Sequence, residues 1–245
     1  MSYKRSDRRK SNEIRSLKVT RNFLEEPEGS VLIEMGNTKV VCTVSVLYTL
    51  PRFIKEQGED FGWITAEYDM LPRAGNRRNI RDRVKGKISG RSQEIQRLIG
   101  RTFRAISNLY AIPKRSVYVD CDVIQADGGT RTAAINGGFL ALYDAFTSMK
   151  NKNQIDEFPL NKFIGAISVG VVENEVLLDL AYDEDVVADV DMNIVKDDEG
   201  NYIEIQGTGE EATFNQKQLN TMLDYAGKGI DDVIKYQKNL IMKDL

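Results

Sequence analysis

The sequence lacks histidine altogether and contains only two cysteines. Without an imidazole, the chain cannot use the general base and metal ligand on which many hydrolytic sites depend. The two cysteines, Cys42 and Cys121, show no zinc-ligand spacing, and we expect both to be buried as small apolar residues. A histidine-based mechanism is therefore excluded, and nothing indicates a cysteine-bound zinc site.

Long apolar runs are also missing from the chain. No run approaches the length of a membrane helix, and the charged residues 1–10 lack the apolar stretch of a signal peptide. No Ser/Pro linker, low-complexity tract or internal repeat interrupts the sequence. We therefore predict a continuous protein that has no membrane partner and stays in the cytoplasm.

Charge is segregated along the chain, although the net charge is only −3. A basic strip between Arg73 and Arg91 contains a single acid, Asp82, whereas acids concentrate after Asp156. Such a strip would bind an RNA backbone through counterion release, or it is simply a solvated loop. The strip contains Arg77, Arg78, Arg81, Arg83, Lys85 and Lys87.

The run 127–132, Asp-Gly-Gly-Thr-Arg-Thr, has the composition of an oxyanion site. Its glycines let the backbone approach a bound group, its threonines offer hydroxyls, and Arg131 offers a planar fork that matches phosphate. A strand pattern at 117–124 precedes the run, and an apolar helical pattern at 132–149 follows it. Strand, glycine turn and helix N-terminus usually build a phosphate pocket, although the run alone is also compatible with a plain turn.

A second guanidinium lies near a predicted helix N-terminus. The apolar spacing of residues 95–106 predicts a helix that begins near Gly90, with Ser89 or Ser92 as its cap. Arg91 is electrostatically odd at that place unless an anion lies nearby, because the helix dipole there already favours negative charge. A solvated arginine is the alternative interpretation.

A dense group of carboxylates ends the strand-like run 177–182. Asp179, Asp183, Glu184 and Asp185 repel one another, and a divalent cation such as Mg²⁺ or Mn²⁺, bound jointly with substrate phosphates, would relieve that repulsion. A solvated acidic loop is the simpler alternative. Asp179 argues against it, because a carboxylate inside an apolar run must be paired or ligate something.

The periodicities predict an α+β protein. The helices are expected at about 90–108, 132–149 and 215–238. The strands are expected at 30–34, 39–46, 117–124, 164–172, 175–180, 189–195 and 202–206.

Landmark motifs occur in a fixed order along nearly the whole chain. They comprise Arg15 with Val19 and Thr20, and the blocks 29–40, 62–73, 90–101, 120–132, 179–185 and 204–208. In these motifs the sequence resembles the ribonuclease PH family of bacteria, which are phosphate-dependent 3′→5′ exoribonucleases and tRNA nucleotidyltransferases. The resemblance implies one compact domain over residues 1–245 of the ribosomal protein S5 domain 2 type, with mixed sheets and flanking helices. Residues 1–14 would form a flexible basic N-terminus and residues 215–245 the C-terminal helix.

The resemblance also assigns roles to particular residues. Asp179 and Asp185 would bind the Mg²⁺ or Mn²⁺ ion and take part in catalysis. Gly129 would supply a backbone contact to the attacking inorganic phosphate. The phosphate would otherwise be held by Arg91, Thr130 and Arg131, and the RNA would be contacted by Arg73, Arg77, Arg78 and Arg81.

The activity implied by the family is phosphorolysis of RNA 3′ ends. Inorganic phosphate, as co-substrate, would attack the last phosphodiester of a tRNA precursor or another RNA, such as rRNA, and release a nucleoside diphosphate. This step needs no imidazole, because phosphate is already anionic and must only be placed and neutralised. It would run backwards when diphosphates are abundant. The family also implies a ring of six subunits, built as a trimer of dimers.

The sequence departs from the family pattern in the basic strip, where the usual Thr-His is replaced by Gly75-Asn76 followed by two arginines. Two other functions remain as alternatives: a ring subunit that binds RNA without cleaving it, and a metal-dependent nuclease that uses water. The first has no need for both halves of the site, and the second leaves the phosphate-binding arginines without a role. An archaeal-type exosome subunit is a third alternative, closer than the other two because it has the same chemistry, but the basic strip and the Gln206-Gly207-Thr208 ending fit the bacterial family better.

Overall fold

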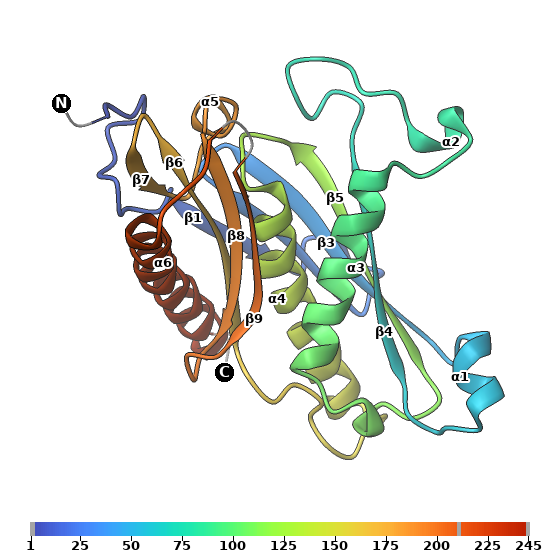
Figure 1. Cartoon of the computed structure of the whole chain (residues 1–245). Helices are drawn as coiled ribbons and strands as arrows, with labels where there is room; N and C mark the ends of the chain where they lie inside the picture. Colours follow the sequence, from blue (N-terminus) through green and yellow to red (C-terminus); the bar gives the residue numbers. More distant parts are fainter. Residues whose placement is uncertain (1–2, 210–211, 244–245) are drawn as a thin grey trace.

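The computed structural model describes residues 3–209 and 212–243 as a stack of layers (Figure 1). A five-stranded sheet is followed by the helices α3 (Gly90–Ala105) and α4 (Thr130–Asn151), then by a four-stranded sheet, and finally by the long helix α6 (Gln216–Met242). The predicted α+β class with mixed sheets is confirmed. The first two residues of the predicted N-terminal arm and the last two of the predicted C-terminal helix lie outside the described residues, as do residues 210–211.

The five-stranded sheet carries the strand that leads into the glycine turn. Its strands are antiparallel except for the last pair, which is parallel. Cys42 and Cys121 oppose each other on its buried face and are free thiols, as expected. In spatial order the strands are β1 (Leu17–Arg21), β2 (Gly29–Met35), β3 (Thr38–Leu47), β5 (Ser116–Gln125) and β4 (Trp63–Met70).

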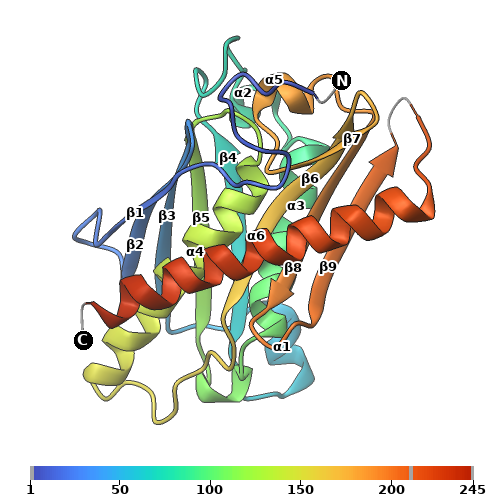
Figure 2. The same cartoon turned by 90° about the vertical axis from the view of Figure 1, so that its left-hand side faces the viewer.

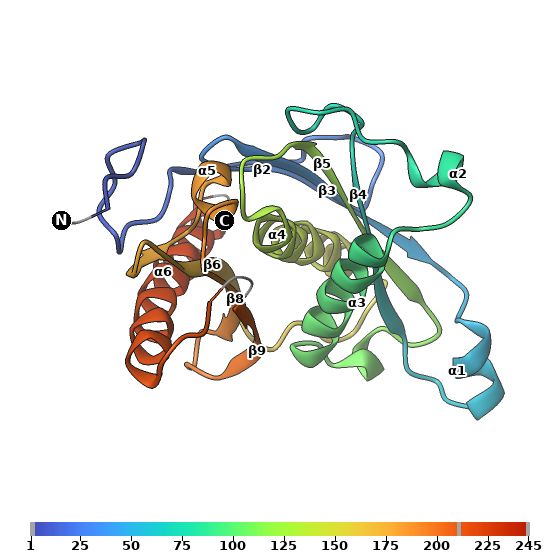
Figure 3. The same ribbon diagram turned by 45° about the horizontal axis from the view of Figure 1, so that its top comes forward.

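The four-stranded sheet is antiparallel throughout and lies between two helix layers (Figure 3). Its inner strand β6 is buried at every position, because α4 covers one face and α6 covers the other. The sequence of a strand that is buried on both faces is a continuous apolar run and does not alternate between apolar and polar residues. In spatial order the strands are β7 (Glu175–Leu178), β6 (Ile164–Val172), β8 (Val190–Asp197) and β9 (Tyr202–Gly209).

The N-termini of three helices lie at the same end of the molecule. Figures 1 and 2 place the starts of α3 and α4 at this end, together with the short helix α5 (Tyr182–Asp185) and the N-terminal segment. The remaining helices are α1 (Arg52–Gln57), at the opposite end, α2 (Asp82–Lys85) in the loop between β4 and α3, and a 3₁₀ turn at Leu109–Ala111. Helix N-termini attract anions, so this end is where a phosphate site is expected.

The N-terminal segment is packed rather than extended. The Tyr3 N–H donates to Glu175 Oε2 at 2.6 Å, the Leu178 N–H donates to the Ser11 carbonyl at 2.7 Å, and the Arg5 residue is only 3% exposed. Residues 3–14 therefore lie against the edge of the four-stranded sheet, in place of the flexible basic arm that we predicted. The physical reason is that their arginines find buried carboxylates and carbonyls as partners.

We predict opposite stability changes for two helical glycines. A methyl group at Gly137 of α4 would lie 2.6 Å from Ile33 Cγ2 and 2.9 Å from Cys42 Sγ, so Gly137→Ala should lower the free energy of unfolding by about 1–3 kcal/mol. Gly227 of α6 has only the Lys196 Nζ atom nearby, at 3.8 Å, and Gly227→Ala should raise it by about 0.5–1 kcal/mol. Urea unfolding measures both; equal shifts would contradict the tight packing of α4.

Candidate active site

A polar cavity of about 240 Å³ lies where α3, α4, α5 and the four-stranded sheet meet. It brings together five of the residues predicted from the sequence: Arg91, Gly129, Thr130, Arg131 and Asp185. Asp179 is not among the residues that line it. The remaining lining residues are Ser168, Val186, Asp191 and Asn193.

The glycine turn before α4 adopts a conformation that other residues rarely take. Gly128 and Gly129 have φ angles of 73° and 61°, in the left-handed region, and Gly129 is the N-cap of the helix. A Cβ at Gly128 would also lie only 2.4 Å from the Leu180 carbonyl oxygen. The backbone N–H groups of the first turn of α4 therefore open next to the cavity, and an anion is the partner that they favour.

Thr130 and Arg131 are held in place by neighbouring side chains. The Thr130 hydroxyl lies 2.8 Å from Tyr68 Oη, and Arg131 NH1 donates to Gln206 Oε1 at 2.6 Å. Glu94 of α3 lies 3.5 Å from the same guanidinium, whose side chain is 13% exposed. Burial raises the pKa of Tyr68, against the lowering effect of the Thr130 hydrogen bond and the nearby arginines, so the phenol stays protonated at neutral pH.

Arg91 is the exposed cation of the site. It follows Gly90 in the first turn of α3, where Ser89 caps the helix by accepting the Ser92 N–H at 3.1 Å. Within the described residues its guanidinium makes no hydrogen bond or ion pair, so all of its donors are available to an anion in the cavity. Helices α3 and α4 thus direct hydrogen-bond donors at one place.

Hard oxygen donors line the other side of the cavity. Asp185 ends α5, while Asp191 and Asn193 lie two residues apart on β8, with Asn193 Nδ2 3.3 Å from Asp191 Oδ2. Asp191 and Asn193 were not predicted from the sequence, where their period-two spacing after the acidic group was the available signal. No group of three or more carboxylate, histidine or cysteine side chains in the described part of the chain could hold a metal ion alone.

These oxygen donors suit magnesium or manganese, because such an ion can be held partly by the protein and partly by other ligands. Two carboxylates and an amide oxygen leave positions open, and Mg²⁺ typically fills such positions with water and substrate phosphate oxygens. Phosphate held by the arginines would lie in the same cavity. Asp185, Asp191 and Asn193 are therefore the residues that could hold the ion.

Asp179 has a different environment from the one we expected. It is fully buried, Arg15 NH2 donates to its Oδ1 at 2.7 Å, and the Arg15 N–H donates to its Oδ2 at 2.7 Å. Burial by itself raises the pKa of Asp179, but the charge and hydrogen bonds of Arg15 outweigh this effect and hold the pKa below its usual value. The metal role predicted for Asp179 does not fit this geometry, because both of its oxygens are engaged by a cation.

The basic strip lies outside the cavity. It forms the loop between β4 and α3 that contains α2, and this loop extends away from the sheets (Figure 1). The side chains predicted to contact RNA make no hydrogen bond or ion pair within residues 3–209 and 212–243. These exposed side chains are Arg73, Arg77, Arg78 and Arg81.

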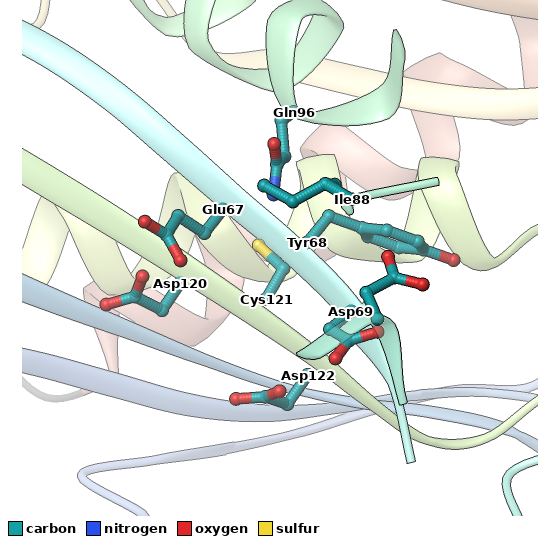
Figure 4. Close-up of a pocket in the computed structure, with 9 residues that line it drawn as sticks. Glu67, Tyr68, Asp69, Ile88, Gln96, Asp120, Cys121 and Asp122 are labelled. Carbon is teal, nitrogen blue, oxygen red and sulfur yellow. The ribbon is translucent and has the colours of Figure 1, made fainter. Parts of the chain in front are cut away.

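An acidic cavity of about 230 Å³ lies at the β4 edge of the five-stranded sheet and reaches Gln96 of α3. Figure 4 shows Glu67 and Asp69 of β4 next to Asp120 and Asp122 of β5. Burial, followed by the charges of Glu67 and Asp122, raises the pKa of Asp120. Phosphate would be repelled here, so this cavity is not the anion site.

We predict that Asp120→Asn stabilises the protein only where Asp120 is ionised. Because the folded state favours the protonated carboxyl, stability falls as the pH rises above about 4, the unfolded pKa, and through the raised folded pKa. The variant should melt at a higher temperature than the parent at pH 7 and at the same temperature below about pH 4. Asp224→Asn, at an exposed position of α6, is the control and should change neither value. The same gain at both pH values would contradict the proposed repulsion.

Two family models match the chain. The model of the 3′ exoribonuclease family, domain 1, matches residues 13–147, and the model of domain 2 of the same family matches residues 162–229. The first match ends within the last turns of α4 and the second begins just before β6, so the first model covers the glycine turn and the second covers Asp185, Asp191 and Asn193. The class of protein is thus a 3′ exoribonuclease fold with its candidate site between the two matched regions.

Full-length relatives make the assignment more specific. Ribonuclease PH of Halalkalibacterium halodurans is 52% identical over 238 residues, which cover 97% of this chain and 92% of that protein. Ribonuclease PH of Bacillus cereus is 49% identical over 238 residues, covering 97% of this chain and 96% of that protein. The chain therefore belongs to the ribonuclease PH family, and the resemblance seen in the ordered motifs is confirmed.

Solved structures share the fold at lower identity. An Archaeoglobus fulgidus exosome with RNA bound to the active site matches with a TM-score of 0.78 and 22% identity over 99% of this chain and 93% of that one. Rice (Oryza sativa) Rrp46 matches with a TM-score of 0.75 and 22% identity over 96% and 98% of the two chains. An archaeal exosome core gives 0.76 and 22% over 96% and 91%.

Within the described residues, no helix combines the length and the apolar character needed to cross a bilayer. Even α4, whose residues are mostly buried, owes its apolar sequence to the two sheets that cover it.

Proposed function

We propose that this protein is a phosphate-dependent 3′→5′ exoribonuclease that trims the 3′ ends of tRNA precursors and releases nucleoside diphosphates. The observation that carries the proposal is the single cavity in which Arg91, Thr130 and Arg131 face Asp185 and Asp191. Anion-binding donors and metal-binding oxygens on opposite sides of one cavity suit phosphoryl transfer from a diester to phosphate. The ribonuclease PH relatives, about half identical over nearly the full length, support the same activity.

The arginines and the helix N-terminus place the nucleophile. Inorganic phosphate, held by Arg91, Arg131, the Thr130 hydroxyl and the first N–H groups of α4, points one oxygen at the terminal phosphorus of the RNA. That oxygen forms a new P–O bond, and the bond between phosphorus and the 3′-oxygen of the preceding nucleotide breaks. The last nucleotide leaves as its diphosphate, and the shortened RNA keeps the 3′-oxygen, which takes up a proton.

Asp185 and Asp191, with Asn193, would hold a divalent cation on the other side of the phosphate. When bound there, magnesium or manganese neutralises charge on the phosphate oxygens and on the leaving 3′-oxygen. Gln206 and Glu94 keep the Arg131 fork oriented, so that little reorganisation is needed when the substrate arrives. A phosphodiester is exchanged for a phosphoanhydride, so the same groups also catalyse nucleotide addition from diphosphates.

The basic strip would supply contacts to the RNA backbone. Its exposed arginines, next in the chain to the Arg91 helix, suit a duplex RNA near its 3′ end, such as a tRNA precursor, or other RNA substrates including rRNA. We further propose a ring of six copies, built as a trimer of dimers, in the cytoplasm. The family resemblance supports this assembly, which would bring several strips around one RNA.

The central experiment is degradation of a tRNA precursor with a labelled 3′ extension, with Mg²⁺, in the presence and absence of inorganic phosphate. We expect nucleoside diphosphates only when phosphate is present. Monophosphates formed without phosphate would mean hydrolysis, and RNA binding without any product would mean a non-catalytic ring subunit. Either result would overturn the proposal.

We predict that Arg131→Ala lowers kcat/KM at limiting phosphate by about 10²–10³-fold, because one preorganised donor to the transferred charge is lost. RNA binding without phosphate should be unchanged, since Arg131 would contact the nucleophile and not the polymer. Arg52→Ala removes an exposed arginine on α1, at the opposite end of the molecule, and should have no effect on either quantity. Normal phosphate dependence in the Arg131 variant would reject its assigned role.

Asp185 and Asp191 are the proposed anionic ligands of the divalent cation. Asp185→Asn and Asp191→Asn should each raise the Mn²⁺ concentration needed for half-saturation, measured by calorimetry, by about tenfold or more, since each removes an anionic ligand. Asp183→Asn removes an exposed acid from the same short helix α5 and should leave Mn²⁺ binding unchanged. Unaltered Mn²⁺ affinity in both cavity variants would place the ion elsewhere.

A further inference from the structure

One guanidinium connects the two halves of the candidate site. Arg15 lies just before β1, and its side chain is only 4% exposed. It contacts both the loop that leads from β7 to α5 and the glycine turn that leads into α4. These two segments are more than 50 residues apart in the sequence and carry, respectively, the metal-side and phosphate-side groups.

On the metal side, Arg15 fixes Asp179. NH2 donates to Oδ1 at 2.7 Å, Nε donates to Oδ2 at 3.1 Å, and the backbone N–H donates to the same Oδ2 at 2.7 Å. Asp179 has a φ of 53°, which a residue with a side chain rarely adopts, so it needs such contacts to hold its conformation. Its own N–H donates to the Ser168 carbonyl at 2.7 Å, and the next N–H, that of Leu180, donates to Ser168 Oγ at 3.1 Å.

On the phosphate side, the same guanidinium holds the carbonyls of the turn. NH1 donates to the Asp127 carbonyl, and NH2 reaches the Gly128 carbonyl at 3.4 Å. Thr38 supports the turn from β3, since its hydroxyl donates to the Gly128 carbonyl at 2.6 Å. With its carbonyls fixed on this side, the peptide N–H groups that follow Gly129 are directed to the cavity.

A second arginine of the N-terminal segment, Arg5, holds the short helix α5 that follows the Asp179 loop. Arg5 donates to both carboxylate oxygens of Glu184 at 2.7 Å, and both side chains are 1% exposed. Glu184 also accepts the Ala181 N–H at 2.9 Å, which closes the single turn of α5. Asp185 is the next residue, so its position in the cavity depends on this buried pair.

We propose that Asp179 is a positioning residue rather than a metal ligand. With Arg15 it ties the loop that bears Asp185 to the turn that bears Thr130, and so sets the distance between the metal ligands and the phosphate donors. The N-terminal segment is then an integral part of the active site. This inference rests on the proposed phosphorolytic function, but its central prediction, which concerns binding, does not need turnover.

The test compares Asp179→Asn and Arg15→Lys with the parent protein. Both variants keep part of the hydrogen bonding. Asp179→Asn loses the negative charge, and Arg15→Lys keeps its charge but loses the planar fork of the guanidinium. Inorganic phosphate should bind about tenfold more weakly, measured by calorimetry, and kcat/KM for phosphorolysis should fall about ten- to hundredfold, as expected when reacting groups are misplaced. The Mn²⁺ affinity should stay within about twofold of the parent value, whereas a metal-ligand role requires it to fall as in Asp185→Asn.

A matched variant separates positioning from general destabilisation. Asp144 of α4 is also a buried aspartate paired with an arginine, Arg21 of β1, but it lies near the opposite end of α4 from the cavity. Asp144→Asn should lower the melting temperature without changing phosphate or Mn²⁺ binding. If Asp179→Asn does not fold, Arg15→Lys carries the comparison alone. The double variant Arg15→Gln/Asp179→Asn should be less impaired than the sum of its single changes, because no buried charge is left unpaired.

Four results have distinct meanings. Weaker phosphate binding with unchanged Mn²⁺ affinity supports the proposal. Weaker Mn²⁺ binding in Asp179→Asn, comparable to that of Asp185→Asn, overturns it and makes Asp179 a ligand. Unchanged binding of both also overturns it, and a parent protein that binds phosphate and Mn²⁺ without forming diphosphates rejects the phosphorolytic function instead.

Discussion

Helix α4 packs on β2 and β3 with one side and on β6 with the other, and this double burial constrains the rest of the molecule. A helix enclosed between two sheets must be apolar or small on nearly every face, and its only accessible part is an end. The N-terminal end opens where β5, α5 and β8 finish or begin. The cavity is there because the first-turn N–H groups of a buried helix need partners, and a bound anion satisfies them.

Parts of the fold and of the site could be predicted from the sequence because their residues lie close together in the chain. The turn 127–132 contains its glycines, hydroxyls and guanidinium in one short run, and the apolar patterns of β6 and α6 are continuous. β1 and β4 were not predicted. β1 has no buried residue, and in β4 the alternation of apolar and polar residues is weakened by Ala66 and two acids. Their place is decided by pairing with β2 and β5, which a single stretch of sequence does not reveal.

The roles of the acids depended on partners distant in the sequence. An aspartate inside an apolar run must be paired or bind something, and for Asp179 the partner is Arg15, 164 residues away. Family resemblance favoured a metal role for it, whereas the structure places Asp191 and Asn193 at the cavity. The basic N-terminal residues were likewise predicted to form a flexible arm, because their buried acceptors, Glu184 and the carbonyls of 178–179, lie far along the chain.

The close approach of Gly128 to the Leu180 carbonyl has a consequence for how the site can change. A Cβ there would meet that oxygen at 2.4 Å, so the gap between the turn and the loop is filled by backbone alone. Any side chain at residue 128 would push the turn before α4 away from the loop before α5. Because the φ of Gly128 is also 73°, any other residue would change both the turn and its spacing to the loop, so the width of the cavity cannot be adjusted at this position.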